Sequence, residues 1–287
     1  MASSVSKAVL ITGCSSGIGR ATAEHLAAQG WTVYASARRR EAIAELEPSG
    51  CRLLELDVCD ESSMKSAVEQ VEQAEGAVGV LINNAGYSQS GAVEDVGMDL
   101  VRRQFETNVF GLLRMCQLAL PGMRSQRWGK VVNISSMGGR LVFPGGGLYH
   151  ATKYAVEALS DAMRFELKGF GVDVVLIEPG LIRTGFGDAA VGSLSEAVTD
   201  DGPYSEFNAA VATATKGAYE KGPLSKLGAG PEAVARTIER AITRRRPKAR
   251  YPVTASARLL LGQRAVTPDR MWDAMMRAQF PQPGPKV

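Results

Sequence analysis

Short apolar runs alternate with amphipathic stretches along most of the chain. A short run of consecutive apolar residues is typical of a strand that is buried on both faces of a parallel sheet, whereas a 3.6-residue apolar period indicates a helix. We expect seven strands, over 8–11, 31–36, 52–58, 78–82, 130–134, 173–178 and 248–254; apolar and polar residues alternate in 52–58. Helical patterns cover 20–29, a stretch ending near 46, 64–74, 99–120, 148–167 and 231–244, with one or two helices over 258–280.

This alternation of strands and helices predicts an α/β fold: a Rossmann-type, doubly wound parallel sheet of about seven strands with helices on both faces. We expect a single domain over residues 1–287. Between residues 185 and 230 small and polar residues are interrupted by glycine and proline, which predicts a mobile substrate lid with short helices. Residues 255–287 would form a C-terminal helical extension that ends in a frayed, proline-rich tail.

Composition and charge exclude several classes of protein. Among 287 residues, 45% are hydrophobic and 22% charged, and the net charge of +3 is too small to indicate a nucleic-acid or membrane partner. The four cysteines have no metal-ligand spacing and only His25 and His150 are available, so we expect no metal site. The sequence also has no signal peptide and no apolar run of membrane-spanning length, which favours a cytoplasmic protein.

A glycine-rich turn follows the first expected strand. It reads Thr-Gly-Cys-Ser-Ser-Gly-Ile-Gly and includes Gly13, Gly17 and Gly19. A strand, a glycine turn and a helix in this order place backbone N–H groups and a helix N-terminus against a phosphate. A plain glycine turn is the alternative, but its position after the first strand favours dinucleotide binding.

The end of the second expected strand bears on the choice of cofactor. Enzymes that prefer NAD usually place an acid here to bind the ribose 2′-hydroxyl, yet this chain has Arg38, Arg39 and Arg40 before its first acid, Glu41. A guanidinium suits a 2′-phosphate. We therefore predict NADP(H), with Arg38 as the first contact and Ser15 as a helper, while Arg39 and Arg40 begin the next helix.

The candidate chemistry centres on Tyr149, Lys153 and Ser136. In a helix over 148–167, Tyr149 and Lys153 share one face. A phenol has an ordinary pKa of about 10, and a nearby ammonium group would favour the phenolate. Tyr-x-x-x-Lys alone is a weak motif, because such pairs also occur on solvated helix faces. Asn108 lies mid-helix, and a buried asparagine there needs a partner.

At this point the chain resembles a short-chain dehydrogenase/reductase over residues 7–184. The resemblance rests on the order and spacing of the glycine turn, Asp57, the Asn-Asn-Ala-Gly segment at 83–86, Asn108, Ser136, Tyr149-x-x-x-Lys153 and Pro179-Gly180. The turn and Arg38, together with the helices after residue 254, are also similar to NADP(H)-preferring hydroxysteroid dehydrogenases of the 17β type.

The resemblance implies a role for each matching residue. Tyr149 would act as general acid or base, Ser136 would polarise the substrate oxygen, and Lys153 would hold the nicotinamide ribose and lower the Tyr149 pKa. Asn108 would position a water through its main chain, and Thr184 would bind the nicotinamide carboxamide. The full set of expected cofactor-binding residues is Gly13, Ser15, Ser16, Gly17, Ile18, Gly19, Arg38, Asp57, Val58, Asn84, Ala85, Gly86, Tyr149, Lys153, Pro179, Gly180, Ile182 and Thr184.

The predicted reaction is hydride transfer between the cofactor and a carbonyl or alcohol carbon of a medium-sized apolar substrate. Ser136, Met137, Phe143, Tyr149 and Phe186 are the expected substrate-binding residues, with Tyr87 and Leu148 close by; several could simply be core. Arg140 and Arg183 leave an acidic substrate open.

Two other readings compete with this one. An epimerase or dehydratase would be a second enzyme class, and a non-catalytic NADP(H)-binding sensor on the same fold is the non-enzymatic alternative. Relatives commonly pair the 99–120 and 148–167 helices between subunits, so we expect a homodimer or homotetramer. The C-terminal extension could block the second tetramer interface. His150, beside Tyr149, points about 100° away round the helix and is expected to pack rather than to react.

Overall fold

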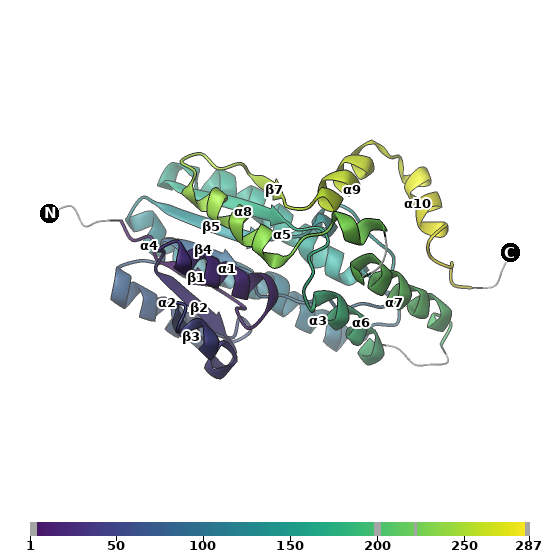
Figure 1. The fold of residues 1–287 in the computed structure, drawn as a ribbon, viewed down its shortest axis with the longest axis horizontal. Helices are drawn as coiled ribbons and strands as arrows, with labels where there is room; N and C mark the ends of the chain where they lie inside the picture. The colour runs from purple at the N-terminus through teal and green to yellow at the C-terminus, as the bar shows by residue number, and fades with distance from the viewer. Residues whose placement is uncertain (1–4, 198–201, 221–222, 285–287) are drawn as a thin grey trace.

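A parallel sheet of seven strands forms the centre of the molecule (Figure 1). The computed structural model describes residues 5–197, 202–220 and 223–284. The strand order β3-β2-β1-β4-β5-β6-β7 confirms the predicted Rossmann-type fold. The strands are β1 (Val9–Ile11), β2 (Val33–Ala37), β3 (Arg52–Glu55), β4 (Val80–Asn83), β5 (Gly129–Ile134), β6 (Val172–Glu178) and β7 (Arg250–Pro252).

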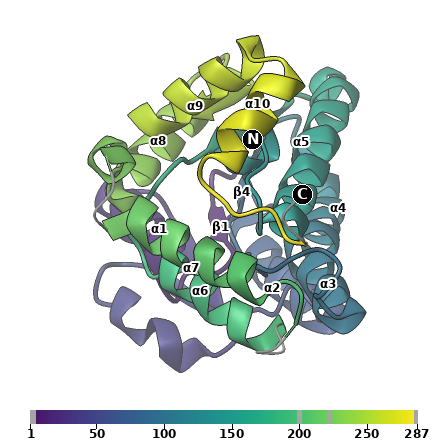
Figure 2. The ribbon, with the colours of Figure 1, turned by 90° about the vertical axis from the view of Figure 1, so that its right-hand side faces the viewer.

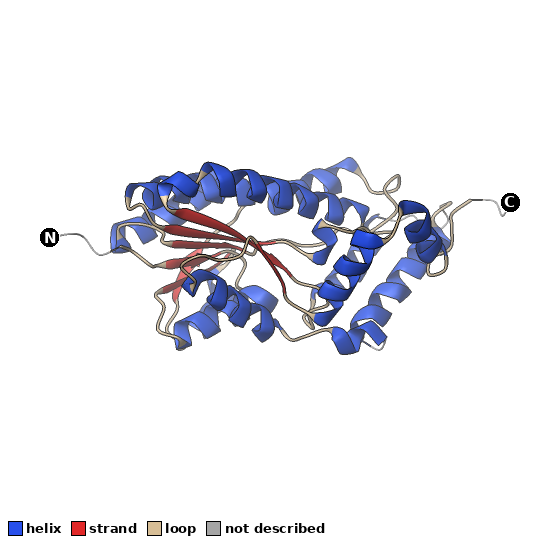
Figure 3. Ribbon diagram, turned by 90° about the horizontal axis from the view of Figure 1, so that it is seen from above, coloured by secondary structure: helices blue, strands red, loops and turns tan. Residues whose placement is uncertain are grey.

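Helices cover both faces of the sheet (Figure 3). Apolar side chains of α2, α4 and α5 pack with one set of strand residues, including Leu10, Leu81 and Val131. Those of α1, α8 and the 3₁₀ helix η1 pack with the opposite set, including Ile11, Ile82 and Val132. The helices concerned are α1 (Gly17–Ala28), η1 (Arg40–Leu46), α2 (Glu61–Glu75), α4 (Leu112–Ser125), α5 (Gly147–Glu166) and α8 (Pro231–Thr243).

Two expected elements near the sheet differ from the prediction. The segment that ends at Leu46 is a 3₁₀ helix rather than an α-helix. The seventh strand has only the three residues of β7 rather than 248–254, because it is an edge strand and pairs with β6 only over Leu176–Glu178.

The long helix expected over 99–120 is interrupted. It consists of α3 (Met98–Phe105), a π-helical segment η2 (Glu106–Gly111) and α4. The wider turn coincides with a close approach to the loop after β3: a Cβ on Gly111 would lie 2.4 Å from the Val58 carbonyl oxygen. Single π turns are frequent at functional sites, and this one carries Asn108.

The region expected to be a lid with short helices contains longer ones. It forms α6 (Phe186–Ala197), α7 (Ser205–Glu220) and the 3₁₀ turn η5 (Pro223–Leu227). Alanine is the best helix former, and the alanines of α7 sustain a 16-residue helix without a strong apolar period. Residues 198–201 and 221–222 of the expected lid lie outside the described part of the chain.

The chain ends in two helices, α9 (Ala255–Val266) and α10 (Asp269–Arg277). Figure 2 shows them at the same end of the molecule as α6 and α7. Leu260, Leu261, Trp272 and Met276 pack around Leu141 from the loop after β5. No helix within the described ranges has the length and apolar character needed to cross a membrane. Residues 285–287 of the expected tail are outside the description.

Candidate active site

The turn after β1 has the shape of a phosphate cradle. Gly13 and Gly17 have φ angles of +74° and +57°, which glycine adopts without penalty. A Cβ on Gly19 would lie 2.3 Å from the Gly13 carbonyl oxygen. The Ser16 side chain makes no capping hydrogen bond to α1, so the first N–H groups of the helix are open to an anion. Ser15 is exposed on the turn.

The segment after β4 is joined to this turn. The Asn84 side chain donates to the carbonyl oxygens of Thr12 and Gly13, both at 2.9 Å. The Ala85 N–H donates to the Thr12 hydroxyl at 3.0 Å. Next along the chain, a Cβ on Gly86 would lie 3.8 Å from the Lys153 ammonium nitrogen. The segment after β4 therefore links the glycine turn to the surroundings of Lys153.

Arg38, which we expect to contact the adenosine ribose, lies at the C-terminal end of β2 near the glycine turn. It follows β2 directly and is exposed, and Ser36, two residues earlier, accepts a 2.8 Å hydrogen bond from the Cys14 N–H of the glycine turn. Arg38 makes no ion pair with any of the described residues. The Arg20 guanidinium, in contrast, is bound by Glu24 and Glu45.

Several other expected cofactor residues lie along the same edge, although two can contribute only through their main chains. The Asp57 carboxylate accepts from the Cys59 N–H at 2.9 Å and is partly exposed. The side chains of Val58 and Ile182 are buried in the hydrophobic core on either face of the sheet, because each lies at the inward-facing position of its loop. The Ile18 side chain likewise packs against the core.

The loop after β6 closes the other side of the cradle. The Pro179 carbonyl oxygen accepts from the Met137 N–H at 2.9 Å, and Gly180 approaches Thr254, where a Cβ would lie 2.3 Å from the hydroxyl oxygen. The Thr184 methyl carbon lies 3.5 Å from the Cβ position of Gly17. The loops after β1, β5 and β6 thus meet at one place.

Tyr149 and Ser136 come together beside this cradle. The Ser136 hydroxyl accepts from the Gly138 N–H at 3.0 Å and lies close enough to the Tyr149 hydroxyl to lower its pKa. Burial has the larger effect and raises the pKa of Tyr149 above its ordinary value, with a smaller increase from Tyr219. The lowering expected from Lys153 is not found: the pKa of Tyr149 is raised, since removing the phenol from water disfavours the phenolate. A protonated phenol suits a proton donor.

Lys153 extends from α5 under the Tyr149 ring, with its nitrogen 5.8 Å from the ring centroid. It is 6% exposed and donates to the Ile134 carbonyl oxygen at 2.8 Å. Burial lowers the pKa of Lys153 to about 8, and the charge of Glu157 opposes that shift. The ammonium therefore titrates near physiological pH.

The side chain of Asn108 has the partners that its buried position demands. Its amide donates to the Tyr87 carbonyl oxygen at 2.9 Å and to the Thr152 hydroxyl at 3.1 Å. Its oxygen accepts from the Tyr87 N–H at 3.1 Å. Asn108 thereby links the β4 loop to the catalytic face of α5.

Of the expected substrate residues, Phe186 contacts Tyr149 directly, and the others lie on neighbouring segments. The Phe186 ring lies 5.5 Å from that of Tyr149. Phe143 lies 6.2 Å from the rings of His150 and Trp272, and Met137 packs against the same C-terminal cluster. Leu148 is partly buried on the turn of α5 before Tyr149. These side chains make an apolar wall.

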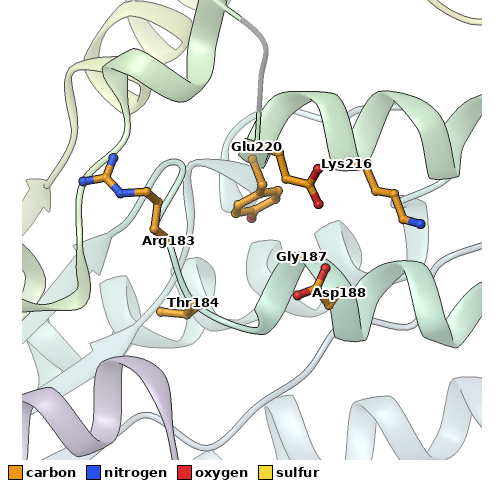
Figure 4. A pocket seen from close by; sticks show the side chains of 7 residues that line it. Arg183, Thr184, Gly187, Asp188, Lys216 and Glu220 are labelled. Atoms are coloured by element: carbon orange, nitrogen blue, oxygen red, sulfur yellow. The ribbon is translucent and has the colours of Figure 1, made fainter.

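A cavity of about 320 Å³ opens between α6 and α7 (Figure 4). Gly187 and Tyr219 line it, as does Thr184, whose methyl carbon approaches Gly17 of the glycine turn. Tyr219 is not among the residues expected from the sequence, although it raises the pKa of Tyr149. Burial raises the pKa of Tyr219 itself to about 12. A tyrosine in an alanine-rich helix was the available signal. Four charged residues also line the cavity: Arg183, Asp188, Lys216 and Glu220.

The two arginines that left an acidic substrate open are placed differently. Arg140 forms an ion pair with the buried Glu178 at 3.4 Å, so its guanidinium is bound by a carboxylate of the protein itself. Arg183 is exposed beside the cavity and remains available to a ligand. No cluster of three or more potential metal-binding side chains occurs in the part of the chain that the structure describes.

Comparison with known proteins agrees with this geometry. The family model described as short chain dehydrogenase matches residues 7–192. The chain belongs to this family of oxidoreductases. A crystal structure of a short-chain dehydrogenase from Streptomyces avermitilis is 35% identical, with a TM-score of 0.77 and coverage of 95% of this chain and 98% of that one.

Two curated relatives have more specific names. A 3-ketodihydrosphingosine reductase from Bacteroides thetaiotaomicron is 44% identical over 63% of this chain, and the match spans 65% of that protein. An NADPH-dependent 3-dehydrocapnine reductase from Ornithobacterium rhinotracheale is 36% identical over 92% of this chain and 94% of that protein.

Proposed function

We propose that this protein uses NADP(H) to interconvert a ketone or aldehyde and an alcohol, with Tyr149 as general acid in reduction and general base in oxidation. The observation that carries the proposal is the meeting of the Tyr149 and Ser136 hydroxyls with the Lys153 ammonium at the end of the glycine cradle. The bound cofactor would supply or accept the hydride.

The chain's own residues would each perform one task. The Ser136 hydroxyl would hold the carbonyl oxygen, and Tyr149, kept protonated by its burial, would donate its proton as the oxygen gains charge. Lys153 would bind the nicotinamide ribose and stabilise the resulting phenolate. Phe186 and the residues around it would exclude water.

The exposed Arg38 supports NADP(H) over NAD(H), as does the name of the 3-dehydrocapnine reductase. The apolar wall supports a medium-sized apolar substrate, and the names of both relatives favour testing long-chain 3-keto compounds as well. Arg38 and the two helices after β7 are the features that support the likeness to the 17β type.

Turnover is tested by following NADPH oxidation with a panel of ketones that includes steroid ketones, aromatic ketones and long-chain 3-keto compounds. We expect Tyr149→Phe to lower kcat about 10²- to 10⁴-fold, the range of general acid catalysis, while it retains NADPH binding. Tyr154→Phe, an exposed tyrosine on the same helix, is the matched control. Full activity of Tyr149→Phe would refute the assigned acid. Tight NADPH binding without turnover of any ketone would favour the alternative, a non-catalytic sensor.

Cofactor preference is tested separately. Arg38→Ala should raise the Kd for NADPH about tenfold or more, because a charge-assisted bond to the 2′-phosphate contributes about 1.5–3 kcal/mol. The Kd for NADH should change little. Arg39→Ala, which alters the next residue along the chain, should leave both values near those of the wild type. Equal losses for both cofactors in Arg38→Ala would contradict the assignment.

We also propose a homo-oligomer of two or four subunits. Large apolar side chains are exposed on the helices expected to pair: Phe110 at 52% and Phe165 at 88%. Light scattering coupled to size-exclusion chromatography measures the assembly, and a monomer at micromolar concentration would exclude it.

A further inference from the structure

A second charged group lies on the same helix as Tyr149 and Lys153. Glu157 follows Lys153 by one helical turn of α5, and residues four apart share a helix face. Its side chain is buried, with 6% of the residue exposed. A buried carboxylate is costly unless it is paired, so this position requires an explanation.

One oxygen of Glu157 is bound and the other is not. The Arg250 guanidinium donates to Oε2 at 2.8 Å, whereas the buried Oε1 has no hydrogen-bond partner among the described residues. Arg250 belongs to β7, which lies beyond the residues matched by the family model. The bond between Arg250 and Glu157 therefore joins the C-terminal part of the chain to α5, the helix that carries Tyr149 and Lys153.

Lys153 needs a nearby negative charge. Its ammonium is buried and donates a hydrogen bond to the neutral carbonyl of Ile134. A Cβ on Gly139 would lie 2.9 Å from Glu157 Cγ and 3.1 Å from the Lys153 carbonyl oxygen. The Gly139 loop thus packs on α5 against the Glu157 side chain and the Lys153 main chain. Both side chains are buried, and charges interact more strongly there than in water.

We propose that Glu157 is a positioning residue of the active site, whose carboxylate, fixed by Arg250, keeps Lys153 a charged ammonium beneath Tyr149. This inference rests on the proposed function, because it assigns a purpose to Lys153. On this proposal the Glu157 carboxylate acts through its negative charge, so its Oε1 can lack a hydrogen-bond partner among the described residues.

The other charges around Glu157 are paired with one another. On α5, Asp161 binds Arg250 at 2.7 Å and also Arg164. On β6, Glu178 lies 3.4 Å from Arg140 and 3.5 Å from Arg250. Burial raises the pKa of Glu178, and the charge of Glu157 adds to that effect. Of all these groups, Glu157 is the one whose charge acts on Lys153.

Glu178 supplies a matched control. It is buried like Glu157, contacts the same Arg250 and has one unpaired oxygen, but it lies on β6 rather than on the helix of Lys153. Glu157→Gln and Glu178→Gln should therefore weaken the same arginine cluster. A merely structural role for Glu157 would make the two variants behave alike.

The test is an NMR titration of Lys153 in protein labelled with ¹³Cε-lysine, with the resonance assigned by its loss in Lys153→Met. In the wild type the midpoint should lie near pH 8. In Glu157→Gln it should fall by about one unit or more, because an opposite charge at close range shifts a pKa by about 1–3 units. In Glu178→Gln it should stay within about 0.3 units, well below that range.

An unchanged midpoint in Glu157→Gln, or an equal fall in Glu178→Gln, would overturn the proposal. If Glu157→Gln does not fold, Glu157→Asp is used, which keeps the charge but withdraws it from Arg250. The Lys153 midpoint should then fall by less than is expected for Glu157→Gln, and an unchanged midpoint would contradict the proposal. The titration uses no substrate, so its result stands apart from the ketone panel. Once a substrate is known, the alkaline limb of kcat/KM should move to lower pH in Glu157→Gln alone.

Discussion

His150 shows how one side chain can fix two loops. Its Nδ1 lies 2.9 Å from the Gly138 carbonyl oxygen, and its Nε2 accepts from the Phe143 N–H at 3.2 Å. These bonds require a neutral ring with the proton on Nδ1. Burial lowers the pKa of His150 to about 4. The histidine therefore holds the Ser136 loop against the apolar wall, and only in its uncharged form.

This arrangement predicts a specific dependence of stability on pH. The unfolded chain binds a proton at His150 below its ordinary pKa of 6.5, and the folded chain does so only below about 4. Folding stability from this group is thus present above pH 6.5 and is lost as the pH falls toward 4, by roughly 3 kcal/mol in total.

His150→Gln removes that dependence. The variant should be less stable than the wild type at pH 7 by about 1–2 kcal/mol, since it cannot keep both hydrogen bonds, and the gap should close or reverse toward pH 4. Urea unfolding at several pH values measures both proteins. A gap of constant size from pH 7 to pH 4 would show that His150 does not carry this titration.

At this scale the sequence predicted the type of role but not the partners. A residue next to Tyr149 points away from the catalytic face of the helix, so packing was the better expectation for His150. Its two bonds depend on where the Gly138 and Phe143 main chains pass, and sequence does not determine such loop paths. The same limit explains why the pairing of Arg140 with Glu178 was not foreseen.

At the scale of elements, the glycine turn and the π-helical segment depend on close approaches of backbone. The turn was predictable because Gly13, Gly17 and Gly19 occur at a telling spacing immediately after an apolar run. The π-helical segment was not, since it goes together with tertiary contacts: the approach of Gly111 to the loop after β3 and the bonds of Asn108 to Tyr87. The lid helices were underestimated because alanine-rich helices have weak apolar periods.

Gly19→Ala tests the turn as an element. The added methyl would meet the Gly13 carbonyl oxygen at 2.3 Å, so the turn must open. We expect the Kd for NADPH to rise at least tenfold, since at least one cradling N–H bond would be lost. Isothermal titration calorimetry measures it. Gly262→Ala in α9, where a Cβ meets nothing within 4 Å, should leave binding intact and stabilise the protein by about 0.5–1 kcal/mol. An unchanged Kd for NADPH in Gly19→Ala would show that the glycine turn does not bind the cofactor phosphates.

At the scale of the whole molecule, the C-terminal helices support the substrate side of the site. Trp272 is 6% exposed, its indole N–H donates to the Val142 carbonyl oxygen at 3.3 Å, and its ring contacts Phe143. The sequence predicted a helical extension here, and the order of strands and helices predicted the sheet. The sequence could not predict where the extension packs, because its apolar pattern does not indicate which loop α9 and α10 cover.

Trp272→Ala should weaken the packing of the C-terminal helices against the loop that carries Val142 and Phe143. Truncating a buried tryptophan costs about 3–5 kcal/mol, which we expect to appear as faster amide hydrogen exchange in α9 and α10. The KM for an apolar ketone should rise several-fold while the Kd for NADPH stays the same, because Phe143 belongs to the wall and not to the cradle. Met271→Ala, an exposed neighbour, is the control. Equal effects on ketone and NADPH would indicate general unfolding instead.

The common direction of the seven strands gives the molecule two unlike ends. Ser6 is fastened at the amino-terminal rim of the sheet by bonds to Ala77 and Gln126, whereas α10 stands beyond the opposite rim, against Val142. A surface linkage or fused reporter joined ahead of Ser6 would sit on the side remote from Tyr149. One joined after α10 would sit on the side that carries the candidate active site. Immobilisation through the amino-terminal side is therefore the orientation that the architecture favours.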